Sequence, residues 1–229
     1  MNTKCEHEAL MNEWKRNRSQ YENFVTDGIL NYEVYYSSKP KIAVLLKESN
    51  DDFIDIAPIT HKGYGPDGNS HLFWRKINIF IYVATAAWNN QQMSYTTIHD
   101  ITEKPINSIA YINVKKNAEN KPKSDNNDIL RYAKQDAYFL QKQIEIIRPE
   151  VIFCCNTKNC YDCIEKTQHI NHNVFMTNDK LIIDYYHPSY PIGFEKSVQD
   201  LSICLFDKKV QQAITAIKNR GKFYHLASI

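Results

Sequence analysis

Four residues of this chain carry side chains that hydrolysis uses, and each ends or closely follows a short apolar run. They are Glu48, Asn50, Asn113 and His187. A carboxylate can orient or activate a water molecule, and an imidazole can donate to an oxygen on which negative charge develops. Each amide offers one acceptor and two donors in a plane, which suits the edge of a nucleobase. Together these groups favour cleavage of a bond between a sugar and a base.

Two aromatic residues at the start of a later apolar segment offer a surface on which a base could stack. Phe73 and Trp74 stand side by side there, and every base has a flat face that an aromatic ring can cover. Each candidate also has a structural alternative. Glu48 could cap a helix, Asn113 could complete a turn, and His187 could be a buried ring bonded to backbone.

The elements that would position these residues are continuous apolar runs that alternate with helical segments. Because such runs are typical of parallel strands covered on both faces, the pattern predicts a three-layer α/β/α sandwich with a central four-stranded parallel sheet. The predicted strands are 42–46, 109–114, 151–155 and 180–189. The predicted helices are 6–27, 73–88, 125–147 with Ser124 as its cap, a short helix after 156, and 198–218. Ligands bind outside the carboxyl ends of such strands, so the candidate residues should share one edge.

Composition and cysteine content limit the possible partners, cellular location and cofactors of the protein. The 229 residues carry a net charge of +2, which neither requires nor excludes a polyanionic partner. No apolar run approaches the length of a membrane span, and the polar N-terminus lacks a signal-peptide core, so we expect a cytoplasmic protein with reduced thiols. Cys160 and Cys163 form a C-x-x-C pair, but thiols also pack well as small apolar groups, and we expect no bound metal. We expect a single domain over 1–229, with a helical N-terminal extension over about 1–39, and a monomer.

An ordered set of segments resembles the uracil-DNA glycosylase superfamily, nearest its iron–sulfur branch. The segments are VLLKESND, LFW, YINVKK, IEIIRPEVIFCCNTKN and YYHPSYP, and they run from about Ile42 to Ile192. The resemblance implies a four-stranded parallel sheet between helices. It also implies a monofunctional enzyme that flips a uracil or modified pyrimidine out of DNA, hydrolyses its N-glycosidic bond and leaves an abasic site.

The resemblance assigns a role to each candidate. Glu48, with Asn50 second, falls on the water-positioning site, Asn113 on the base-reading amide, and His187 on the histidine that stabilises the departing base. Phe73 falls on the stacking aromatic, with Trp74 as its rival. Five further residues are expected to contact DNA: Lys115, Lys116, Ser189, Tyr190 and Ile192. The bulky side chains of Tyr190 and Ile192 would act as a wedge in the base stack.

The chain also departs from the family pattern. The first motif of the family is usually built on Gly and Pro, whereas Lys47, Ser49, Asn50 and Asp51 stand here. Lys47 could therefore contact a phosphate or an unusual base substituent. The loop NVKKNAENKP lacks the expected cluster cysteine, so we predict no iron–sulfur cluster and no other cofactor. Two alternatives stay open: a non-catalytic DNA-binding module of the same fold, and a hydrolase of free nucleosides or nucleotides.

Overall fold

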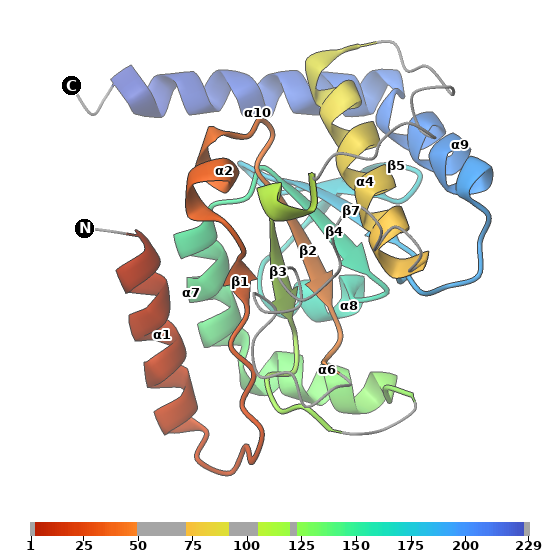
Figure 1. The fold of residues 1–229 in the computed structure, drawn as a ribbon. Coiled ribbons are helices and arrows are strands. Elements are labelled where there is room, and N and C mark those ends of the chain that lie inside the picture. Colours follow the sequence, from red (N-terminus) through yellow and green to blue (C-terminus); the bar gives the residue numbers. More distant parts are fainter. Residues whose placement is uncertain (1–2, 50–71, 92–104, 120–122, 227–229) are drawn as a thin grey trace.

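The computed structural model describes residues 3–49, 72–91, 105–119 and 123–226, and Figure 1 shows how their elements are arranged. A seven-stranded sheet lies at the centre, with the strand order β1-β3-β2-β4-β7-β6-β5. Its parallel strands are β2 (Ile42–Leu46), β3 (Ile109–Asn113), β4 (Val151–Cys155) and β7 (Leu181–Tyr185). The first three of these strands lie at or within one residue of the predicted bounds, whereas the fourth ends at Tyr185, before the predicted end at Ser189.

The expected four-stranded parallel sheet is wrong as a description of the whole sheet, which is mixed. Antiparallel strands extend both sides: β1 (Gly28–Ile29) pairs with β3, while β6 (Val174–Met176) joins β7 to β5 (Gln168–Asn171). The added strands are short, and β5 is largely exposed, so they lack the buried apolar run that marks the parallel strands. The α/β class is confirmed.

Helices cover both faces of this sheet. On one face, α4 (Leu72–Asn89), α9 (Phe194–Leu205) and α10 (Lys208–Leu226) bury a core with alternate strand residues such as Val44 and Phe153. On the other face, α1 (Thr3–Asn17), α6 (Asn126–Gln135) and α7 (Ala137–Ile147) pack on residues such as Leu45 and Ile152. Shorter helices are α2 (Tyr32–Ser37), α8 (Lys158–Tyr161) and the 3₁₀ turn η2 (Pro105–Ser108). Within the described residues, no helix is both long and apolar enough to span a bilayer.

The helix predicted over 125–147 is broken in two at Asp136. This residue is fully buried, and its carboxylate accepts hydrogen bonds from Arg18 Nε at 2.6 Å and from the Tyr21 hydroxyl at 2.8 Å. Its backbone leaves the helical region to reach these partners. The N-cap of α6 is Asp125 rather than the predicted Ser124, because the Asp125 side chain accepts from the N–H of Asn127.

The other long predicted helices also differ in their bounds. The first ends at Asn17 rather than continuing to 27, and the last is divided into α9 and α10 around Phe206 and Asp207. The expectation of one domain with an N-terminal extension stays a prediction. Within residues 3–38 the structure has α1, β1 and α2, with α1 packed against α7 (Figure 1).

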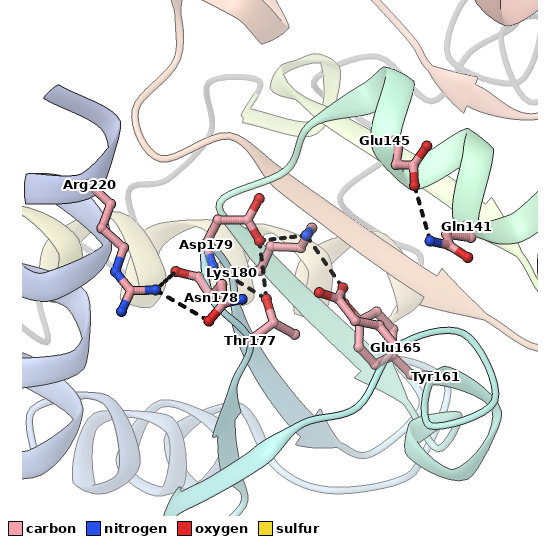
Figure 2. Close-up of polar contacts among 9 residues, drawn as sticks. All are labelled: Gln141, Glu145, Tyr161, Glu165, Thr177, Asn178, Asp179, Lys180 and Arg220. Carbon is pink, nitrogen blue, oxygen red and sulfur yellow. Dashed lines mark hydrogen bonds and ion pairs between the residues drawn. The ribbon is translucent and has the colours of Figure 1, made fainter. Parts of the chain in front are cut away.

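A polar cluster fixes the turn that leads from β6 into β7, at the edge opposite the carboxyl ends of the parallel strands (Figure 2). Lys180 Nζ lies 2.6 Å from Asp179 and 3.4 Å from Glu165, which follows α8. Arg220 from α10 donates to the carbonyl of Asn178 at 2.7 Å. These contacts tie the antiparallel side of the sheet to its covering helices.

Candidate functional site

The carboxyl ends of β3, β2 and β7 bring three predicted site residues to one edge of the sheet. Asn113 ends β3 and pairs in register with Leu46 of β2, so Glu48 follows two residues beyond a neighbouring strand. His187 follows β7, which is separated from β2 by β4. Asn50, the second predicted water-positioning residue, lies outside the described residues.

His187 is held as a neutral ring with a defined tautomer. The backbone N–H of Ser189 donates to His187 Nδ1 at 3.2 Å. Because Nδ1 accepts this bond, the proton of the neutral imidazole lies on Nε2. Burial, reinforced by the positive charges of Lys47 and Lys76, lowers the pKa of His187 to about 4. The ring therefore offers a neutral N–H donor at neutral pH.

An aromatic group lies beside this imidazole. The ring centroids of Phe73 and His187 are 5.8 Å apart, and Trp74 contacts Phe73 edge-on at 4.8 Å. Trp74 also packs edge-on against Tyr111 of β3, at 5.7 Å. The N-terminal end of α4 thus places both predicted stacking residues between β3 and the segment that follows β7.

Glu48 is the acid of this edge, and it belongs to a buried ion cluster. Its side chain is 3% exposed, and Oε2 lies 3.1 Å from Lys115 Nζ in an ion pair without the alignment of a hydrogen bond. Lys115 also contacts Glu119 at 2.8 Å and Asp128 at 2.9 Å. Burial alone would lower the pKa of Lys115, but its contacts with the carboxylates of Glu119, Asp128 and Glu48 outweigh burial and raise it. The lysine is therefore a fixed cation that holds the Glu48 carboxylate in place.

A second buried network fixes the backbone of Asn113. Asp27 accepts a hydrogen bond from Asn113 N at 2.6 Å, and Lys116 Nζ donates to Asn113 O at 2.8 Å. Lys116 also pairs with Asp27 at 2.6 Å, and both side chains are fully buried. Gln143 donates to Asp27 at 2.8 Å and contacts His7 at 3.1 Å. Both main-chain polar groups of Asn113 are thus held by one ion pair.

This network also explains why Gly28 follows Asp27. Gly28 has φ +138°, a conformation that side chains with a Cβ rarely adopt. A Cβ at this position would lie 2.4 Å from Cε1 of His7. The glycine therefore lets β1 pass close enough to α1 for His7 to reach Gln143.

The two lysines predicted to contact phosphate do not face solvent. Lys115 is 1% exposed and Lys116 is fully buried, and both ammonium groups contact carboxylates. Neither could reach a DNA phosphate without leaving those ion pairs. The pair of lysines that follows β3 is structural because both side chains are buried and their charges are balanced by carboxylates, among them Asp27 and Glu48.

The segment after β7 presents aromatic surface instead. Tyr190 is 52% exposed and stacks on Tyr186, which is 48% exposed, with ring centroids 4.9 Å apart and planes 11° apart. The Lys76 ammonium from α4 donates to the carbonyl of Tyr190. Ser189 is exposed and Ile192 is half-buried. All three predicted contact residues of this segment are at or near the surface.

The six cysteines are free thiols. Burial raises the pKa of Cys154 and Cys155 well above the ordinary thiol value, and raises that of Cys160 to about 11, so these thiols stay protonated at neutral pH. In the part of the chain that the structure describes, no three His, Cys, Asp or Glu side chains gather in a way that could hold a metal ion.

Two acidic residues of this region were not among the predicted site residues. Asp27 lies before a two-residue strand, where no apolar pattern marks a buried position. Asp184 did leave a signal, because it interrupts the apolar run of β7, and its side chain lines a polar cavity beside α8.

Comparison with known proteins adds no assignment to this geometry: no family model matches the chain, and a search of curated proteins finds no match.

Proposed function

We propose that the protein hydrolyses the N-glycosidic bond of a uracil or modified pyrimidine flipped out of DNA, as its resemblance to uracil-DNA glycosylases implies. The observation that carries this proposal is the tautomer of His187. A neutral ring whose Nδ1 accepts from Ser189 N presents its N–H at Nε2, which is the donor that an oxygen of a departing base anion requires. The donor is fixed before the reaction begins.

The other groups at this edge supply the remaining steps. A water attacks the sugar carbon, the carbon–nitrogen bond breaks, and its electron pair leaves with the base. Glu48 would orient the water and accept its proton, with Lys115 holding the carboxylate. Asn113 would bond the edge of the base, and Phe73 or Trp74 would stack on it. Hydroxide from the water stays on the sugar, and an abasic site remains.

The exposed tyrosine pair suits the DNA side of this proposal. Tyr186 and Tyr190 follow β7 directly, close to His187, so they would meet the strand from which the base is extruded. Their rings can stack on neighbouring bases and offset part of the few kcal/mol that extrusion costs. We further propose that the protein acts on DNA in the cytoplasm as a monomer.

One observation favours the non-catalytic alternative. The Glu48 carboxylate is almost fully buried and already paired with Lys115, which restrains its approach to a water. A DNA-binding module that kept these side chains without the hydrolysis would bind abasic or base-modified DNA and release no free base.

A panel of DNA duplexes distinguishes the glycosylase from the non-catalytic binding module. Each duplex carries one altered base, is incubated with excess protein, and is then treated with alkali, which cleaves at abasic sites. Cleavage at one or a few altered pyrimidines supports the glycosylase. Binding with no cleavage across the panel supports the binding module and rules out the enzyme for those bases.

A further inference from the structure

Asp184 is an acid at a strand position that would ordinarily be apolar. It lies in β7 between Ile183 and Tyr185, both buried. Side chains alternate along a strand, so Asp184 shares the sheet face of Ile182, which belongs to the core under α6 and α7. Burial raises the pKa of its carboxyl, although the charge of Lys158 opposes this. An acid is rarely placed at such a position unless it has a partner or a ligand.

The Asp184 side chain faces a cavity of about 180 Å³. At about 30 Å³ for each water of the bulk liquid, this volume corresponds to roughly six waters, and so to a single small ring. Four amide side chains line the cavity with it: Asn126 and Asn127 from α6, and Asn156 and Asn159 from the α8 region. None of the groups proposed for base excision lines it.

The backbone holds one of these amides in an unusual conformation. Asn156 has φ +60°, in the left-handed region that residues with a Cβ enter rarely. Its N–H donates to the carbonyl of Tyr185 at 2.8 Å, which fixes it between the ends of β4 and β7.

The charges of the cavity do not favour an anionic ligand. The charge of Lys158, whose residue also lines the cavity, is balanced by the Asp162 carboxylate at 2.6 Å, and its ammonium lies 4.1 Å from the centroid of the Phe175 ring. Asp184 has no hydrogen bond or ion pair through its carboxyl within the described residues. The charged group left to meet a ligand is therefore the Asp184 carboxylate, an acceptor, while Ile129 and Leu130 give the cavity an apolar wall.

We propose that this cavity binds the amino-bearing edge of a nucleobase of the cytosine or adenine type. The Asp184 carboxylate accepts from the exocyclic amino group, and an Asn amide donates to the adjacent ring nitrogen, which is the donor and acceptor pattern of that edge. The apolar wall covers the flat face of the ring. This site is separate from the excision site, and its test does not depend on base excision.

Nuclear magnetic resonance of the ¹⁵N-labelled protein, titrated with cytidine, adenosine, uridine and thymidine, tests the proposal directly. We expect the side-chain amide signals of Asn126, Asn127 and Asn156 to shift with cytidine or adenosine and to shift less with uridine or thymidine. Short single strands of dC and dT, added in separate titrations, show whether the base binds free or within a nucleic acid. Absence of shifts with all four nucleosides and both strands would overturn the proposal.

The variant Asp184→Asn separates recognition from folding. Its amide can donate to the carbonyl that uridine carries in place of the amino group, so the preference for cytidine over uridine should fall at least about tenfold. Asp179→Asn is the matched control, because Asp179 lies just before the same strand and pairs with Lys180 outside the cavity. An unchanged preference in Asp184→Asn, with a melting temperature like that of the control, would also overturn the proposal.

Discussion

His187 is the central residue of the proposed excision reaction, and its surroundings keep its ring neutral. Its pKa is lowered to about 4, from an ordinary value of 6.5, by burial and then by Lys47 and Lys76. If the neutral ring is the active form, activity is present above this pKa and lost as pH falls through it. Excision should therefore stay constant through pH 6.5 and decline only near about 4, measured as single-turnover rate against pH.

The charge of Lys47 gives this pH prediction a control. Lys47→Ala removes one of the charges that lower the pKa of His187, so the acid limb of the profile should move to higher pH. Lys209→Ala, which removes an exposed lysine of α10, should leave the profile unchanged. If the pH profile of Lys47→Ala matches that of the wild type, the loss of activity at low pH reflects the titration of a group other than His187.

For single residues, the sequence predicted where the site side chains lie on the sheet better than it predicted which groups contact them. Glu48, Asn113 and His187 were expected at one edge because residues that follow parallel strands share that edge. The burial of Lys115 and Lys116 was not predictable, since their partners Asp27 and Asp128 become neighbours only in the folded chain. A lysine beside a predicted site looks the same in sequence whether it meets a phosphate or a buried carboxylate.

At the scale of elements, the end of β3 depends on the ion pair between Asp27 and Lys116. Asp27→Asn leaves a buried lysine without its counter-charge, so we expect the free energy of unfolding to fall by about 3–5 kcal/mol. The double variant Asp27→Asn with Lys116→Met removes both charges and should recover most of this loss. Chemical denaturation followed by circular dichroism measures both effects.

The same double variant tests whether the pair positions Asn113. The carbonyl of Asn113 loses its bond from Lys116, and the uncharged amide at position 27 accepts more weakly from Asn113 N, so discrimination between bases should weaken even where stability is recovered. Asp136→Asn is the comparison, because it weakens a buried pair with Arg18 that does not touch Asn113. Loss of discrimination in both variants alike would reduce the Asp27 pair to a purely structural role.

The elements themselves were predictable where a single physical signal dominated. The predicted bounds of α4 and of the first three parallel strands were close to those observed, whereas the fourth strand ends at Tyr185 rather than at Ser189. The break at Asp136 was missed because an apolar stripe runs through both α6 and α7, and only the distant Arg18 and Tyr21 explain the interruption. The hairpin of β5 and β6 was missed because β5, with the sequence QHIN, buries little.

At the scale of the whole molecule, the net charge of +2 gives little attraction for DNA, so stacking should contribute much of the affinity. Tyr186→Ala and Tyr190→Ala should each weaken binding to single-stranded DNA by about 1–3 kcal/mol, measured by fluorescence anisotropy. Tyr138→Ala is the matched control, since Tyr138 is 60% exposed but lies on α7. Equal losses in all three variants would contradict a DNA-facing role for the segment after β7.

The proposed roles of His187 and Glu48 are tested by a single-turnover assay. The assay measures the rate at which free base is released from the duplex that the panel identifies. We predict that wild-type protein releases the base and that His187→Ala and Glu48→Gln each lose at least about a hundredfold in rate, with melting temperatures close to that of wild type. Release at the wild-type rate by both variants would contradict base excision by these two residues.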